Sequence, residues 1–384
     1  MTFDSPKFFI YLSALLFLTS CAGLPVRGRV GGQTIESRVD SEVARYYLSS
    51  YLAGKRSDPA LDERIDRLYQ GAHDGLPTRS ELKRLSDDFS VDFAALHLTD
   101  RIASTPVNRR FRTVFDKAHA HTRKAFAEDR VILPDSAADY EVVFVPSYLY
   151  KRYPVTGADF AAPRTALRRV GLSHGFVETD EDAAIEANAN LVVADIRERA
   201  RTGRRLILVS ASKSSPEVAL ALTRLRPTET HHVAAWINIV GALQGSPLAD
   251  ERLLPEIEDE IGRVDIAGME SLTTQRSRQR FNSFRIPKHL LVVNYIGIPL
   301  TGSISAMARV GFLRLRNHGP NDGLVLLSDL IFPGGVTLIE LGSDHFLLNG
   351  QIAVTTVALA ITVIRWVENH DPIMPQSLEA SVGK

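Results

Sequence analysis

The chain of 384 residues contains a single cysteine, Cys21, so no disulfide can form within it. It also has no excess of charge, because 45 Lys and Arg residues balance 45 Asp and Glu residues. Proteins that bind nucleic acid usually carry a basic surface, and this balance argues against such a partner. The histidines, including His231 and His232, show no metal-ligand spacing. We therefore expect no nucleic acid, no metal and no other cofactor.

Long apolar runs and internal repeats are missing as well. The apolar stretch at 8–18 has about eleven residues, which is too short to cross a bilayer of roughly 30 Å as a helix. A second apolar stretch, 352–367, is interrupted by threonines. Its length and composition favour a helix buried against a sheet over a membrane span.

The first residues are typical of an export signal. Lys7 precedes the short apolar run, and small residues follow it up to Cys21. The segment 18–21, Leu-Thr-Ser-Cys, resembles the lipobox of bacterial lipoproteins, in which the cysteine becomes the lipidated first residue. This resemblance implies that Cys21 carries acyl chains such as palmitate and holds the protein in the cell envelope. Ala22 in the next position favours the outer membrane; the alternative is a plain signal peptide with an incidental cysteine.

The remaining sequence divides into three parts by composition and by the spacing of its apolar residues. Residues 22–39 are rich in Gly and Arg and are expected to be a tether. Residues 40–135 show apolar residues at three- and four-residue spacing, which predicts a helical N-terminal segment. That segment either packs against the rest of the protein or binds a partner that the sequence does not name. From 136 to 384 short apolar runs alternate with helical patterns.

This alternation predicts an α/β domain with a mainly parallel central sheet flanked by helices. The expected helices include 181–200 and 215–224, and a polar, helical stretch at about 249–287 is expected to form a cap over the carboxyl edge of the sheet. The expected strands are 141–146, 175–178, 205–210, 233–240, 290–295 and 336–341.

Ser212 lies where a tight turn would join the strand at 205–210 to the following helix. Such a turn needs small residues two positions before and after the serine, and Ser210 and Ser214 meet this size rule. Neither Ser210 nor Ser214 fits as the central serine, because Leu208 or Pro216 would then occupy a flanking position. Ser212 is therefore a candidate nucleophile, and capping of the helix is the alternative.

Two further candidate residues, an aspartate and then a histidine, lie in predicted loops after Ser212 in the chain. Asp322 lies in Asn-Asp-Gly-Leu-Val, and His345 lies in Ser-Asp-His-Phe. Asp-Gly is also a strong turn signal, so Asp322 has a structural alternative. Asp344 and His318 are weaker candidates for the acid and the base. The order nucleophile, acid, base is that of the α/β-hydrolase fold.

With the loop at 237–250, these segments resemble the bacterial triacylglycerol lipases and esterases of the α/β-hydrolase superfamily, from about residue 140 to the end. The resemblance implies a serine hydrolase with the triad Ser212, Asp322 and His345. It implies an oxyanion hole made of the backbone N–H groups of Lys213 and Tyr148, with Ser147 as the alternative to Tyr148.

The expected substrate is a carboxylic ester, which a lipid-like or a soluble molecule could supply. Transfer of the acyl group to an alcohol is a second enzymatic possibility. Both glycines of the usual Gly-x-Ser-x-Gly pattern are serines here. This departure motivates a third hypothesis, a catalytically inactive envelope lipoprotein that uses the fold as a binding or scaffold module.

Overall fold

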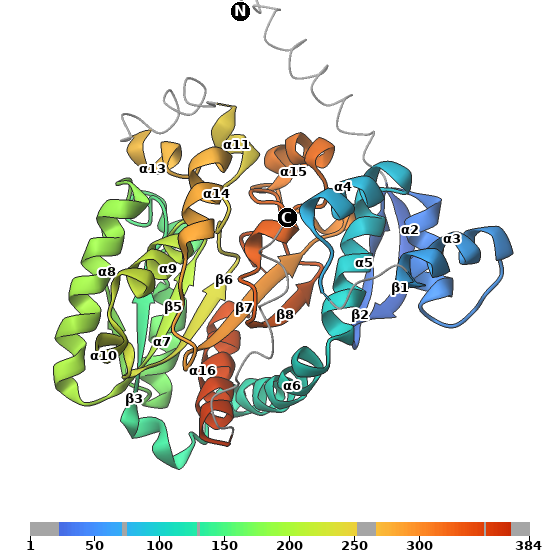
Figure 1. Ribbon diagram of the computed structural model, residues 1–384. Helices are drawn as coiled ribbons and strands as arrows, with labels where there is room; N and C mark the ends of the chain where they lie inside the picture. Colours follow the sequence, from blue (N-terminus) through green and yellow to red (C-terminus); the bar gives the residue numbers. More distant parts are fainter. Residues whose placement is uncertain (1–22, 71–74, 129–130, 252–265, 349–350, 370–384) are drawn as a thin grey trace, which may run out of the picture.

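A computed structural model describes residues 23–70, 75–128, 131–251, 266–348 and 351–369. The export signal and Cys21 lie outside these residues. The centre of the molecule is a six-stranded parallel sheet with the strand order β4-β3-β5-β6-β7-β8 (Figure 1). All six strands expected from the sequence are present. They are β3 Tyr140–Val145, β4 His174–Phe176, β5 Arg205–Ala211, β6 Val233–Ile239, β7 Leu291–Ile298 and β8 Val336–Leu341.

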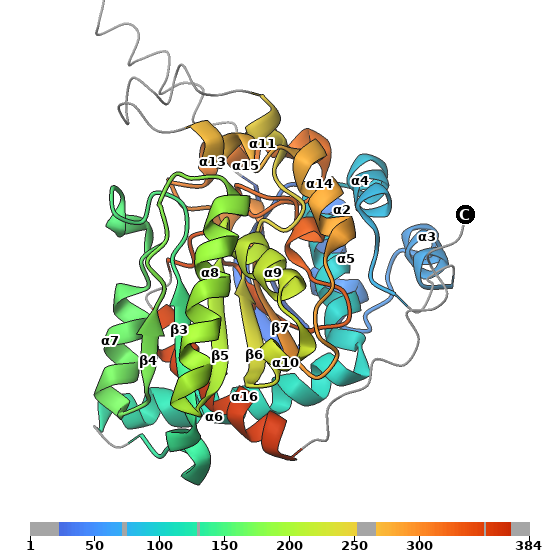
Figure 2. The same cartoon turned by 60° about the vertical axis from the view of Figure 1, so that its left-hand side comes forward.

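Helices cover both faces of the sheet because alternate side chains of each strand point to opposite faces. Val143 and Leu208 pack on one face with α8 (Ile185–Arg199) and α9 (Ser214–Arg224). Phe144 and Val209 belong to the core on the other face. Figure 2 shows α8 and α9 together in front of the strands. α7 (Ala161–Val170), α6 (Pro106–Ala127) and α16 (Ile352–Asn369) lie on the other face.

The apolar C-terminal helix α16 (Ile352–Asn369) is long and apolar enough to cross a membrane by length and composition alone. In this fold its side chains from Thr355 to Ile364 are buried, and Trp366 packs edge-on against Phe111 at 5.0 Å between ring centroids. The helix is therefore part of the core of the α/β domain.

The N-terminal segment is mainly helical. After α2 (Glu42–Tyr46) the chain makes a π-helical turn and then continues into the remaining helices. These are α3 Pro59–Gln70, α4 Arg79–Asp88, α5 Val91–Ser104 and α6 Pro106–Ala127.

The prediction of a tether at 22–39 is wrong. This stretch forms an antiparallel hairpin of β1 (Leu24–Val30) and β2 (Gln33–Val39). Gly31 and Gly32 both have positive φ, 58° and 80°, as a two-residue hairpin turn requires. Alternate side chains, Val26 and Val30 among them, are buried, and the arginines that suggested a tether occupy the exposed face.

The N-terminal segment packs along β8, the edge strand of the sheet. Gln33 Nε2 and Arg112 Nη1 each donate to Ile339 O at 3.0 Å, and Asn108 Oδ1 accepts from Thr337 N at 2.8 Å. An open edge strand presents unpaired backbone groups to other chains. Side chains of the β1–β2 hairpin and of the N-terminal segment occupy these groups at Thr337 and Ile339 of β8.

Short helices lie over the carboxyl edge of the sheet, where the cap is expected (top of Figure 1). The described parts are α11 (Pro247–Asp250), α13 (Ile266–Glu270) and α14 (Thr274–Ser283). The middle of the expected cap, 252–265, lies outside the described residues. α15 (Arg309–Leu315), from the segment after β7, lies beside them.

Candidate active site

Ser212 occupies the tight turn between β5 and α9. Its φ is 48°, in the left-handed region that residues with a side chain rarely adopt. Its N–H donates to Ile239 O of β6 at 3.1 Å, which fixes the turn against the neighbouring strand. This is the geometry of a serine held up at the carboxyl edge of a parallel sheet.

The two serines that stand in the usual glycine positions are part of the turn. The Ser214 hydroxyl donates to Val145 O at 2.8 Å and accepts from Ala211 N at 2.9 Å. The Ser210 hydroxyl accepts from Trp236 Nε1 at 2.8 Å. Both serines are fully buried. The departure from the glycine pattern is therefore accommodated, because each hydroxyl is small and has hydrogen-bond partners.

Asp322 and His345 form a buried pair. Asp322 Oδ2 lies 2.6 Å from His345 Nδ1, and its Oδ1 accepts from Leu324 N and Val325 N at 3.0 and 2.8 Å. A backbone bond from His345 N to Asp322 O, 2.9 Å long, joins the two loops again. His345 Nε2 is buried and has no hydrogen-bond partner among the described residues.

The alternative acid and base lie elsewhere. Asp344 Oδ2 accepts from Ser305 N at 2.7 Å and its Oδ1 from Phe346 N at 3.1 Å, so its carboxylate stabilises the loop. His318 is exposed and does not line the cavity that contains Ser212.

Ser212 and His345 open into one cavity of about 470 Å³. Most of its wall is apolar, and Arg314 in the wall forms an ion pair with Glu251 at 3.8 Å. The apolar side chains in the wall include Leu149, Phe160, Ile239, Val240, Leu272, Leu324, Val325 and Leu347. A cavity of this kind excludes water and accepts an apolar group next to the serine hydroxyl.

Backbone strain is concentrated around this cavity, which the sequence did not reveal. Within the described residues, five residues other than glycine have positive φ, and all five line the cavity. They are Leu149, Phe160, Ser212, Val240 and Leu347. Strained conformations of this kind cluster at functional sites, where the surrounding structure holds them.

The loop expected to supply an oxyanion donor follows β3. Ser147 N donates to Ala158 O at 2.9 Å, and Leu149 N donates to Glu181 O at 3.0 Å. The N–H of the alternative donor Ser147 is therefore already engaged, which argues against this residue as the donor. Tyr148, between these two residues, lines the cavity. Lys213 directly follows Ser212, and its side chain is buried away from the cavity wall.

Sequence reasoning also missed the partner of Lys213. Its ammonium lies 2.5 Å from Glu217 Oε1, and both side chains are almost fully buried. The spacing of four residues at the start of the helix predicted at 215–224 was the available signal, but such pairs are usually exposed. In the described part of the chain, no group of three or more His, Cys, Asp or Glu side chains is arranged to hold a metal ion.

No protein-family model and no curated protein matches the sequence. The structure is similar to that of the metagenomic carboxyl esterase MGS0156, with a TM-score of 0.51 and 22% identity over 62% of this chain and 78% of that one. This is the α/β-hydrolase fold. The fold class expected from the sequence is thereby confirmed.

Two other solved structures resemble this chain with lower TM-scores. The mature lipase BlEst2 of Bacillus licheniformis has a TM-score of 0.45 and 23% identity, over 57% of this chain and 91% of that one. The phospholipase PlaB of Legionella pneumophila has a TM-score of 0.42 and 12% identity, over 61% of this chain and 64% of that one.

Proposed function

We propose that the protein is a serine hydrolase that cleaves a carboxylic ester through an acyl-Ser212 intermediate. One observation carries the proposal. The buried Asp322–His345 pair leaves His345 Nε2 without a partner in the apolar cavity that also contains Ser212 on its strained turn. A nucleophile, a base and an acid that orients the base are the parts that acyl transfer to a serine requires.

The proposed reaction has two halves. His345 Nε2 takes the hydroxyl proton of Ser212 while Oγ forms a bond to the ester carbon, and the carbonyl oxygen becomes an oxyanion. The N–H groups of Lys213 and Tyr148 stabilise this oxyanion. When the ester C–O bond breaks, the alcohol leaves with the proton from His345. Water then repeats the sequence on the acyl-Ser212 ester and releases the acid.

Asp322 keeps His345 in the required tautomer, with the proton on Nδ1. Its two oxygens have separate partners, since Oδ1 is held by backbone N–H groups and Oδ2 contacts the histidine. The carboxylate also stabilises the imidazolium formed in each half-reaction. The apolar wall supports an ester with an apolar acyl chain, which a lipid-like substrate provides.

Hydrolysis of a series of p-nitrophenyl esters of increasing acyl length tests this proposal. Ser212→Ala is expected to lower kcat by about a thousandfold or more, since it removes the nucleophile. Ser246→Ala is the matched control, because Ser246 also lines the cavity but uses its hydroxyl on Leu324 O. Equal rates for the wild type and Ser212→Ala would contradict the proposal, and rates of both proteins no higher than without protein would favour the inactive binding module.

We further propose that Cys21 is lipidated and anchors the enzyme in the cell envelope, in the outer membrane. The lipobox-like segment supports this assignment. β1 begins at Leu24, so the folded body would start close to the membrane surface. Cells fed an alkyne analogue of palmitate should label the wild type in the membrane fraction and leave Cys21→Ser unlabelled. Labelling of Cys21→Ser, or an unlabelled wild type, would contradict the anchor.

A further inference from the structure

Lys213 and Glu217 form a buried ion pair directly beneath the proposed nucleophile. The two side chains are 2% and 1% exposed, and neither residue lines the cavity. The two side chains therefore do not touch a substrate, and only the backbone N–H of Lys213 is proposed to reach it. Removing two charges from water is costly, and apolar residues of similar volume often stabilise a protein as well or better. The pair calls for an explanation other than stability.

The carboxylate of this pair is incompletely satisfied. Oε1 of Glu217 receives both the Lys213 ammonium and Asn188 Nδ2, the latter at 3.0 Å, while Oε2 has no partner among the described residues. Burial raises the pKa of Glu217, and the charge of Lys213 opposes that rise. This arrangement fixes the position of Lys213 at an energetic cost.

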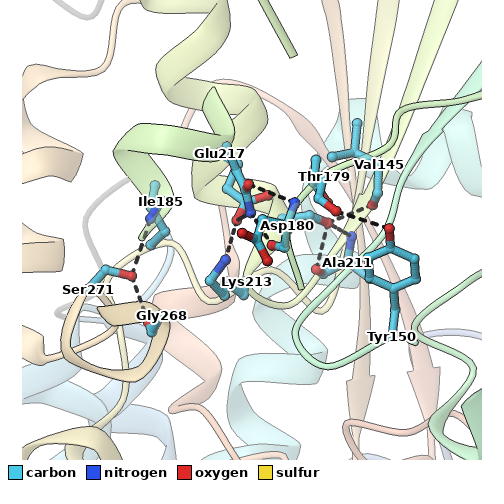
Figure 3. Close-up of polar contacts among 12 residues, drawn as sticks. Val145, Tyr150, Thr179, Asp180, Ile185, Ala211, Lys213, Glu217, Gly268 and Ser271 are labelled. Carbon is cyan, nitrogen blue, oxygen red and sulfur yellow. Dashed lines mark hydrogen bonds and ion pairs between the residues drawn. The ribbon is translucent and has the colours of Figure 1, made fainter. Parts of the chain in front are cut away.

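From Glu217 the hydrogen bonds continue to the loop after β4 (Figure 3). Asn188 donates to Asp180 O at 2.8 Å and accepts from Asp180 N at 3.1 Å. The next residue, Glu181, accepts from Leu149 N through its carbonyl oxygen and from Lys151 N, at 2.9 Å, through its carboxylate. The loop that contains Tyr148 is thus held directly after that residue, at Leu149 and Lys151.

Lys213 also reaches Tyr148 directly. Its ammonium lies 6.0 Å from the centroid of the Tyr148 ring, at the outer limit of a cation–π contact. The other side of this region is packed against the cap. A Cβ on Gly268 of α13 would lie 2.7 Å from Tyr148 Cε2 and 2.4 Å from Asp182 O, so the cap approaches closely only because residue 268 is a glycine.

The cap is joined to the same region by Ser271, also drawn in Figure 3. Its hydroxyl donates to Gly268 O at 2.7 Å and accepts from Ile185 N at 3.4 Å, at the start of α8. Contacts therefore run without a break from the nucleophile turn, through α8 and α9, to the loop of Tyr148 and to the cap.

We propose that Lys213 and Glu217 are positioning residues that set the geometry of the oxyanion hole. This inference rests on the proposed function. The buried pair holds the backbone of Lys213, which supplies one oxyanion donor. Through Asn188 and the loop at 180–181 it also holds the loop of Tyr148, which supplies the other. The contacts of Gly268 and Ser271 with this region make the geometry of the oxyanion hole depend on the position of the cap.

The test replaces the pair by apolar residues in the double variant Lys213→Met, Glu217→Leu. Urea unfolding is expected to show a free energy of unfolding equal to or above that of the wild type. Ester hydrolysis is expected to show kcat lowered by about tenfold to a hundredfold with KM unchanged, because misplaced donors weaken only the transition state. The single variant Glu217→Gln, which keeps the volume, is expected to show the same split between kcat and KM.

A matched control is Glu141→Gln, which alters another buried carboxylate. Glu141 pairs with Arg199 at 2.5 Å near the amino end of β3, at the opposite edge of the sheet from Ser212. It is expected to affect stability but not kcat.

Wild-type kcat in the folded double variant and in Glu217→Gln would overturn the inference while leaving the proposed hydrolase intact. Absence of Ser212-dependent hydrolysis in the wild type would remove both. A fall in kcat that Glu141→Gln reproduces would show a general loss of stability and would also overturn the inference.

Discussion

Ser212 and the other strained residues of the cavity are each held by the backbone around them. The N–H of every one of the five donates to a carbonyl oxygen; Val240 N, for example, donates to Tyr295 O at 2.9 Å and Leu347 N to Asp344 O at 3.1 Å. A left-handed conformation costs about 1 to 3 kcal/mol for such residues. The fold stabilises these conformations because hydrogen bonds to neighbouring strands and loops hold the backbone in place.

Ser214→Ala tests the role of the flanking serines in the turn. The change leaves Ala211 N without the partner that Ser214 Oγ provides and removes a donor from Val145 O. We expect the free energy of unfolding to fall by about 1 to 3 kcal/mol. Urea denaturation measures the change.

Ser49→Ala is a suitable control for that experiment, since the Ser49 hydroxyl donates to Arg45 O in an exposed hydrogen bond. It should stay within about 0.5 kcal/mol of the wild type. A loss for Ser214→Ala no larger than that of Ser49→Ala would show that the Ser214 hydroxyl is not needed in the turn.

The sequence predicted a triad of Ser212, Asp322 and His345, and the structure joins Asp322 to His345 by a direct hydrogen bond. The size rule singled out Ser212 because a tight turn leaves room for small neighbours only. The positive φ values of Leu149 and Val240 could not be predicted, because these residues give no local sign of a left-handed conformation. Tertiary contacts impose it.

Among the elements, the N-terminal segment has a clear structural role along the edge strand β8. Asn108 is central to it, because its amide is buried and bridges two elements. Oδ1 accepts from Thr337 N of β8 and Nδ2 donates to Ile102 O of α5, at 2.8 and 3.0 Å. The helices thereby replace the neighbouring strand that β8 lacks.

We expect Asn108→Ala to lower the free energy of unfolding by about 2 to 4 kcal/mol, since it leaves buried backbone groups without partners. Arg109→Ala, one residue further along α6, is the control. Arg109 is exposed, and its guanidinium donates to Ser104 O at 2.9 Å. Thermal unfolding of the two variants tests this expectation. Equal melting temperatures would show that Asn108 does not stabilise the packing along the edge strand β8.

The hairpin of β1 and β2 shows why composition alone led to the wrong prediction of a tether. Gly and Arg together are typical of flexible tethers, yet Val26, Val30, Ile35 and Val39 alternate with them and are buried. The two adjacent glycines marked the turn. The period-two pattern was available in the sequence, but a hairpin this short is stable only because it packs on the helices that follow it.

Across the whole molecule, buried carboxylates join the N-terminal segment to the α/β domain. Arg79 of α4 forms an ion pair with Asp329, which follows the Asp322 loop. Asp92 of α5 accepts from Thr301 N, after β7, at 3.1 Å, and from Asp40 N at 2.8 Å. Burial and the nearby charge of Asp40 raise the pKa of Asp92 to about 7.

This raised pKa predicts a pH dependence of stability. Between pH of about 4 and 7 the folded protein keeps a proton on Asp92 that the unfolded chain releases, so the free energy of unfolding falls as pH rises through this window. Asp92→Asn should remove that part of the fall and unfold at a higher temperature than the wild type at pH 8. Parallel curves for the two proteins from pH 5 to pH 8 would contradict the assignment.

The α/β class of the whole molecule was predictable because strands and helices alternate in period from about residue 140 onward. The covering of β8 by the N-terminal segment was not, since it depends on single side chains such as Gln33 and Arg112 that contact Ile339 from distant parts of the chain.

The central claim is that Ser212 is an activated nucleophile, and covalent labelling tests it most directly. The purified protein without residues 1–21 would be treated with a fluorophosphonate, and intact mass and peptide mapping would locate the adduct. The account predicts one adduct on Ser212 that is absent in Ser212→Ala and strongly slowed in His345→Ala. A well-folded wild type that remains unlabelled, or labelling that persists in Ser212→Ala, would contradict it.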